Sequence, residues 1–242
     1  MRVLALDTTT RAGSVALIED DQVIDERGGD GARTHAERLP GEITAIVDAN
    51  RLALPDVDLY AVASGPGSFT GLRIGIATIQ GLAFVHRRRI VGIPALEALA
   101  HLGSHDMSPG MVIASLMDAH RREVFAAVYR VTSAAPFTPD RLVEIEGPTV
   151  GDPASTLARW ISVLGVVPAV FTGDGAVMYA DHLRRAVTSA RVVPPPLLAG
   201  AIGRLAVAYA GRGETVEAAG LQPLYVRRPD AEIARDEASR LS

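Results

Sequence analysis

The sequence predicts an α/β protein with two lobes, and two features of the chain indicate this. In each half, short runs of β-branched and apolar residues separated by turn residues precede stretches in which apolar residues recur at helical spacing. The second half begins again with a strand, a turn and a strand, just after the turn-rich segment Ser108-Pro109-Gly110. We therefore expect a first lobe over residues 1–107, a smaller second lobe over 108–226 and a charged tail over 227–242.

The first lobe should open with hairpins and continue with alternating helices and strands. Thr34, followed three residues later by Glu37, has the pattern of a capping box, so a helix should begin there and run to about Arg51. A second helix should begin near Leu72, and a third near Pro94. The expected strands cover residues 3–7, 14–19, 22–27, 59–63 and 90–93.

The second lobe is expected to resemble the first in its opening elements. Strands are expected over 111–118, 124–131 and 169–172, and helices over 153–164 and 197–210. Asp118 would then end its strand as Asp7 does in the first lobe. A structural repeat explains this likeness, and so do two similar hairpins without any duplication.

The composition excludes several classes of protein. The 242 residues carry a net charge of −4, which does not suit a protein that neutralises many nucleic-acid phosphates by itself. Cysteine and lysine are both missing, which excludes disulfides, thiolate chemistry and a P-loop lysine; a genome rich in G and C explains the missing lysine equally well. Without an export signal or a span of about 20 apolar residues, the expected location is the cytoplasm.

One glycine-rich segment, from Ala63 to Gly75, runs from a strand into a helix. Backbone N–H groups and a helix N-terminus would meet there, as in sites that bind phosphate. The spacing matches neither the dinucleotide fingerprint nor a Walker A loop, and the glycines serve equally as turn and packing positions. The candidate nucleotide-binding residues are Asp7, Thr9, Gly65 and Gly67, and for Asp7 capping of the hairpin turn through Thr9 is the simpler role.

Three segments resemble the TsaB (YeaZ) family. They are the residues 65–77 with Gln80-Gly81-Leu82-Ala83, the opening Leu4-Ala5-Leu6-Asp7-Thr8-Thr9, and the late residues 223–232. The resemblance implies a two-lobed actin-like fold, of the acetate kinase, sugar kinase, Hsp70, actin and ribonuclease H-like type. It also implies an accessory, non-catalytic subunit that supports a TsaD-type catalytic subunit in making threonylcarbamoyladenosine at position 37 of tRNA.

The catalytic relatives of that family carry a metal-binding His-x-x-x-His pair on a helix, and the matching run here is Ala95-Leu96-Glu97-Ala98-Leu99. We therefore expect neither a bound metal nor catalytic residues. His101 and His105 have the same spacing a few residues later, but Gly103-Ser104 between them predicts a fraying helix end. The alternatives are a stand-alone enzyme of the same fold, ATP-using or metallopeptidase-like, and a homodimeric scaffold.

The resemblance also implies that the two helices of the first lobe bind a partner. The implied partners are the TsaD-type subunit, a TsaE-type ATPase and, for the chain alone, a second copy, with tRNA met only through the complex. No cofactor is expected to bind tightly, although ATP or ADP is implied at the interface between subunits. The apolar residues of these helices exceed what one face needs, so the surplus would meet a partner or lie between core layers. The candidate interface residues are His35, Leu39, Ile43, Phe69, Arg73, Ile76 and Gln80.

Overall fold

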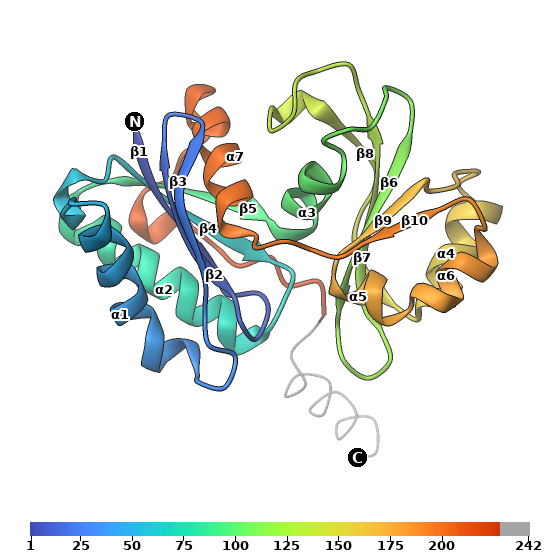
Figure 1. The fold of residues 1–242 in the computed structure, drawn as a ribbon, viewed down its shortest axis with the longest axis horizontal. Coiled ribbons are helices and arrows are strands. Elements are labelled where there is room, and N and C mark those ends of the chain that lie inside the picture. Colours follow the sequence, from blue (N-terminus) through green and yellow to red (C-terminus); the bar gives the residue numbers. More distant parts are fainter. Residues whose placement is uncertain (228–242) are drawn as a thin grey trace, which may run out of the picture.

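The computed structural model describes residues 1–227, and these residues form two five-stranded sheets in two lobes (Figure 1). The first sheet has the order β3-β2-β1-β4-β5. β1, β2 and β3 pair antiparallel, and β4 and β5 join β1 in parallel. Its strands are Arg2–Asp7, Ser14–Glu19, Gln22–Gly28, Leu59–Gly65 and Arg89–Pro94 for β1 to β5.

The second sheet repeats the topology of the first. Its order is β10-β9-β6-β7-β8, with β6, β7 and β8 antiparallel and with β9 and β10 parallel to β6. Read from β6, this is the same arrangement as in the first sheet, so the two lobes are a structural repeat rather than two similar hairpins. The strands β6 to β10 are Val112–Asp118, Val124–Val131, Leu142–Gly151, Val170–Thr172 and Arg191–Val193.

Helices cover both faces of each sheet, so the molecule has five layers (Figure 1). One face of the first sheet packs on α1 and α2, and the other packs on α3 and α7. The same α3–α7 layer meets the inner face of the second sheet, and α4, α5 and α6 cover its outer face. The helices α1 to α7 are His35–Ala49, Phe69–His86, Ala95–Gly103, Pro153–Ser162, Asp174–Met178, Ala180–Ala186 and Ala199–Gly211, and the 3-10 turns are Leu54–Asp56, Pro139–Arg141 and Ala218–Gly220.

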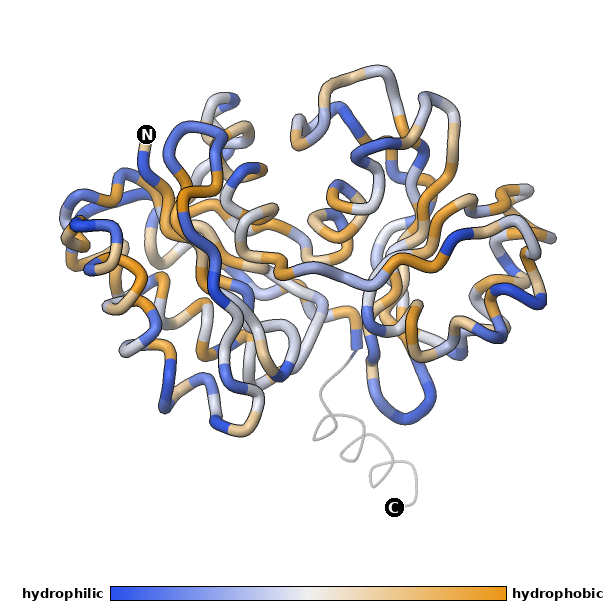
Figure 2. Tube along the Cα trace, in the orientation of Figure 1, coloured by the Kyte–Doolittle hydropathy of each residue, from blue (hydrophilic) through white to orange (hydrophobic). Residues whose placement is uncertain are grey.

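The alternation of side chains along the strands produces these layers. In β1, Val3 and Ala5 face α3 and α7, while Leu4 and Leu6 face α1 and α2. The largest apolar cluster extends from the first sheet through α3 and α7 to Phe125 and other residues of the second sheet. Figure 2 shows the apolar residues along the strands, and it shows a hydrophilic hairpin loop between β6 and β7. A single core therefore joins the lobes.

The chain after Leu198 returns to the first sheet. The predicted second lobe, residues 108–226, includes α7, yet α7 lies against β1, β2, β4 and β5. Val216 then pairs with Ile90, and the Leu224 N–H donates to the Ser64 carbonyl at 2.7 Å. At the end of this segment, Arg227 donates to the Ala119 carbonyl of the second lobe at 2.7 Å. Apart from Arg227, the predicted charged tail lies outside the described residues.

The predicted start of α1 is confirmed, and α2 starts earlier than predicted. The Thr34 N–H donates to the Glu37 carboxylate at 2.8 Å, which is the bond from the N3 side chain in a capping box, and the Thr34 Oγ1 donates to the same carboxylate at 2.8 Å. α2 begins at Phe69 rather than near Leu72, because Ser68 caps it by accepting from the Gly71 N–H at 3.3 Å. Within residues 1–227, no helix combines the length and the apolar character that a bilayer span needs.

Candidate functional site

The glycine-rich segment between β4 and α2 packs against the turn that follows β1. A Cβ on Gly67 would lie 2.5 Å from the Thr9 Cβ, and one on Gly75 would lie 2.1 Å from the Thr8 Oγ1. The Ser68 N–H donates to the Thr9 carbonyl at 2.9 Å. The glycines therefore allow α2 to lie directly on this turn, which favours the packing interpretation over phosphate binding.

Gly65 is also enclosed by the chain itself. It has a φ of +120°, which favours glycine, and a Cβ there would lie 2.6 Å from the Leu224 carbonyl oxygen. Thr9 against Gly67 and Leu224 against Gly65 show that close packing within the chain requires a glycine at both positions. Nucleotide binding by Asp7, Thr9, Gly65 and Gly67 stays a prediction.

Asp7 closes the turn after β1. Its Oδ1 accepts from the Thr9 N–H at 2.8 Å and from the Thr9 Oγ1 at 2.6 Å. Burial raises the pKa of the Asp7 carboxyl, and the two hydrogen bonds from Thr9 oppose that shift. Asp7 and Thr9 therefore cap this turn, which is the simpler of the two roles predicted for Asp7.

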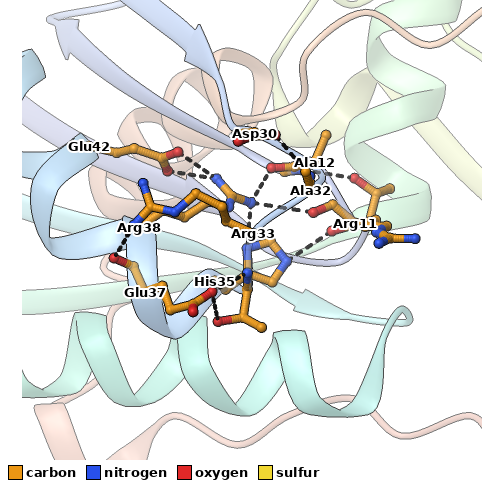
Figure 3. A network of polar contacts seen from close by, with 12 residues as sticks. Arg11, Ala12, Asp30, Ala32, Arg33, His35, Glu37, Arg38 and Glu42 are labelled. Carbon is orange, nitrogen blue, oxygen red and sulfur yellow. Dashed lines mark hydrogen bonds and ion pairs between the residues drawn. The ribbon is translucent and has the colours of Figure 1, made fainter.

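A buried network fixes the next part of this turn to α1 (Figure 3). The Arg38 side chain is 2% exposed, and its Nη1 donates to both carboxylate oxygens of Glu42 at 2.7 Å. Its Nη2 contacts the His35 Nδ1 at 2.7 Å and donates to the Ala12 carbonyl. The His35 Nε2 lies 3.0 Å from the Thr10 carbonyl.

This network determines the state of His35. A carbonyl only accepts, so the proton must be on Nε2, which leaves Nδ1 to accept from Arg38. Burial and the Arg38 charge lower the pKa of His35, in agreement with a neutral ring. His35 was predicted at a partner interface, but it is buried and holds the turn in place.

The structure corrects three further interface predictions. Leu39 and Ile43 are buried in the core between the first sheet and its outer helices, and Ile76, which is 5% exposed, packs in the same core and reaches only the groove described below. Phe69 and Arg73 are exposed, and Gln80 is half-buried. Besides Thr70 in the first turn, the exposed residues of α2 follow helical spacing, and they are Phe69, Arg73, Ala77, Gly81, Phe84 and Val85. We call these six residues the α2 face.

Phe84 and Val85 are the most exposed large apolar residues of the α2 face, at 79% and 71%. Sequence reasoning missed both. Their only signal was that the apolar residues of α2 continue around the whole helix, which does not reveal the outward side.

A groove of about 360 Å³ lies between the α2 face and residues 221–225. We call these five residues the C-terminal segment. Arg73 stands at one end, with its guanidinium 3.9 Å from the centre of the Phe69 ring and its Nε 3.0 Å from the Tyr225 hydroxyl. The Gln80 Nε2 donates to the Leu221 carbonyl at 3.2 Å. The lining residues are Arg73, Ile76, Ala77, Gln80, Leu221, Gln222, Pro223 and Tyr225.

His101 and His105 do not share a site. His101 is completely buried in α3, stacks on Phe137 and has its Nε2 3.8 Å from a Glu97 carboxylate oxygen. Burial and the Arg141 charge lower the pKa of His101 to about 4. His105 is exposed beyond the helix end and contacts Asp106 at 2.9 Å. One ring faces the core and the other faces solvent.

The order of the strands and the shared helical layer define the fold class of the protein. Two lobes of repeated β3-β2-β1-β4-β5 topology, joined through a shared helical layer, make this a two-lobed actin-like protein. An activator of 2-hydroxyisocaproyl-CoA dehydratase from Clostridium difficile has the same fold, with a TM-score of 0.51 over 88% of this chain and 97% of its own, at 11% identity.

Closer relatives identify the family. Residues 17–146 match the family model of TsaD, tRNA N6-adenosine threonylcarbamoyltransferase. The tRNA threonylcarbamoyladenosine biosynthesis protein TsaB of Haemophilus influenzae is 30% identical over 94% of both chains, and that of Bacillus subtilis is 27% identical over 99% of this chain and 100% of its own. YeaZ from Pseudomonas aeruginosa is 27% identical with a TM-score of 0.72, over 93% of this chain and 99% of its own. The chain belongs to the TsaB (YeaZ) family.

Proposed function

We propose that this chain is an accessory subunit in the synthesis of threonylcarbamoyladenosine at position 37 of tRNA, and that its α2 face binds a TsaD-type catalytic subunit. The relatives named above carry that biosynthetic name. The observation that carries the binding proposal is the α2 face itself. It presents Phe84 and Val85 to solvent on a helix whose opposite side is already packed on the sheet.

Two glycines support a close contact at this surface. Gly41 of α1 and Gly81 of α2 are exposed, and a Cβ on either would meet no atom of residues 1–227 within 4 Å. Each costs about 1 kcal/mol of helix stability relative to alanine. Packing within the described part of the chain gives no reason for that cost, whereas close approach of a partner helix to the backbone does.

The catalytic work is assigned to the partner. The run that corresponds to the metal-binding histidines of the catalytic relatives is aliphatic here, with Ala95, Leu96, Ala98 and Leu99 all buried. His101 is enclosed in the core, and His105 stands apart from it. The same surface would serve for homodimers when the catalytic subunit is missing. Recruitment of a TsaE-type ATPase, and ATP or ADP at the subunit interface, remain predictions from the family.

A binding experiment with matched variants tests the proposal. The dissociation constant for the TsaD-type subunit of the same organism is measured by calorimetry for the wild type, Phe84→Asp and Val163→Asp. Val163, at the end of α4, is 73% exposed and lies on the other lobe. We expect Phe84→Asp to weaken binding at least about tenfold and Val163→Asp to leave it unchanged, because only the first charge enters the interface.

A third variant separates binding from folding. Gly81→Gln adds bulk to the α2 face while improving the helix, so it should raise the melting temperature and weaken binding. Transfer of the threonylcarbamoyl group to tRNA should require both subunits. Equal binding by Phe84→Asp and Val163→Asp, or transfer by the isolated chain, would contradict the proposal and favour the homodimeric scaffold or the stand-alone enzyme respectively.

A further inference from the structure

We propose that Arg73 and the groove beside it receive a carboxylate side chain of the catalytic subunit. This inference rests on the proposed function. The feature of the partner that is recognised beside the α2 face is an aspartate or glutamate, which enters the groove between α2 and the C-terminal segment.

The Arg73 guanidinium is held in place before any partner arrives. Its Cζ lies over the Phe69 ring, 3.9 Å from the centroid, and its Nε donates to the Tyr225 hydroxyl at 3.0 Å. The two rings contact each other, with centroids 5.2 Å apart. The Arg73 side chain is therefore fixed by Phe69, which contacts the guanidinium, and by Tyr225, which accepts from its Nε. Its two Nη groups can then donate to a further acceptor.

Within the described residues, no carboxylate forms an ion pair with Arg73. Other exposed arginines of the protein do have such partners, as Arg89 has Glu217 and Arg212 has Asp140. A planar guanidinium whose two Nη groups are both available can bind a carboxylate through two parallel hydrogen bonds.

The groove selects a single carboxylate rather than a polyphosphate. Among residues 1–227, Arg73 is the one cation that lines the groove, and no acidic residue lines it. A triphosphate would need several cations or a series of backbone N–H donors. The floor is apolar, from Ile76 and Leu221, and the rim carries Gln80 and Gln222. An acidic side chain with an aliphatic stem fits that combination, since its methylene groups cover the floor and its carboxylate meets Arg73.

The C-terminal segment forms one wall of this site. Leu221 to Tyr225 is attached to the first lobe through the Leu224 N–H on Ser64 and through Gln80 on the Leu221 carbonyl. A Cβ on Gly92 would lie 2.5 Å from the Leu221 side chain, so this wall is closely packed. The groove therefore exists in the free subunit, which reduces the cost of ordering it on binding.

The test measures binding of the complete TsaD-type subunit to Arg73→Gln, Arg73→Lys and the control Arg184→Gln, an exposed arginine of α6. We expect Arg73→Gln to weaken binding by about 30-fold or more, because the partner's carboxylate would be left buried without a counter-ion. Arg73→Lys should bind with intermediate affinity, since an ammonium cannot form the paired hydrogen bonds. Arg184→Gln should bind as the wild type does.

A charge exchange identifies the carboxylate. Arg73→Glu should lose binding, and one Asp→Arg or Glu→Arg change on the catalytic subunit should restore it. Failure of every such change to restore binding would overturn the inference, as would unchanged binding by Arg73→Gln. If Arg73→Gln affects only homodimers, measured by light scattering, the occupant is a second copy and the inference is wrong. If it removes only ADP binding, the occupant is a phosphate and the inference is again wrong.

The two proposals fail in different ways. A wild-type chain that does not bind the catalytic subunit overturns the proposed function and this inference together. Binding that depends on Phe84 but not on Arg73 overturns the inference alone.

Discussion

Asp7 and Asp118 occupy the same place in the two lobes. Each is the last residue of the central strand of its sheet, and each accepts a hydrogen bond at 2.8 Å from the backbone N–H two residues later, on Thr9 and His120. The carboxylates thus stabilise equivalent turns after β1 and β6. The surroundings of the two turns differ. α2 packs onto the first turn, whereas the second turn contains the exposed residues His120, Arg121 and Arg122.

The contact between α2 and the first turn gives a first prediction. Gly75→Ala should reduce the free energy of unfolding by about 1–3 kcal/mol, because its Cβ would overlap Thr8. Gly81→Ala, six residues further along the same helix and in open space, should raise it by about 1 kcal/mol. Urea unfolding monitored by circular dichroism measures both values. A neutral Gly75→Ala would mean that α2 does not lie against this turn.

The buried network at the start of α1 gives a second prediction. Arg38→Met should destabilise the fold by about 2–3 kcal/mol, because the carbonyl of Ala12, the His35 ring and Glu42 lose their donor. Arg38→Lys should recover only part of this loss, since an ammonium cannot reach all three acceptors. Arg33→Met, an exposed arginine five residues earlier, is the control and should change stability little. Equal stability of the two methionine variants would contradict the network.

The elements with strong local signals could be predicted from the sequence, and those fixed by distant contacts could not. The hairpins and the α1 capping box follow from alternation and from Thr34 and Glu37. β8 was missed because it contains Gly147 and Pro148, which disfavour strands, and only pairing with β7 holds it. The position of α7 on the first sheet was missed because it depends on the tertiary structure alone.

The same distinction applies to the candidate site. Amphipathic spacing identifies apolar residues but does not say which of two apolar sides faces the sheet, so it predicts Leu39 and Ile43 at an interface and gives no indication that Phe84 is exposed. Arg38 looks like an ordinary surface residue in sequence. The signal for its burial is the Gly28-Gly29 pair, since Gly29 has no side chain where Arg38 passes.

A third prediction concerns pH. The folded-state pKa of His101 is about 4, below the usual 6.5, so the unfolded chain binds this proton more readily than the folded one. The contribution of His101 to stability is complete above pH 6.5 and falls as the pH drops toward 4, by about 3 kcal/mol in all. Glu97 partly offsets this loss of stability at low pH, because burial raises the pKa of its carboxyl in the folded state and the folded chain therefore binds that proton more readily.

His101→Leu tests this pH dependence. Both ring nitrogens of His101 are buried and have no hydrogen-bond partner among the described residues, so an apolar side chain of similar size should fit without loss at pH 7. Between pH 6.5 and 4.5, urea unfolding should show a smaller decline for His101→Leu than for the wild type. Parallel declines for the two proteins would show that His101 does not titrate as its burial implies.

The shared core between the lobes gives the last prediction, that the two lobes unfold together. The largest apolar cluster includes residues of both sheets and of the α3–α7 layer between them, and Phe125 of the second sheet belongs to it along with Val3 of the first. Trp160 is the one tryptophan of the chain and lies in the outer core of the second lobe, so its fluorescence reports on that lobe. Circular dichroism reports on both lobes. Urea transitions followed by the two methods should coincide, because opening either lobe exposes the common cluster.

Ala100→Asp, in the buried α3 layer, should lower both midpoints equally. Two separate transitions, with the fluorescence change preceding or following the loss of helix, would show that the lobes are independent folding units.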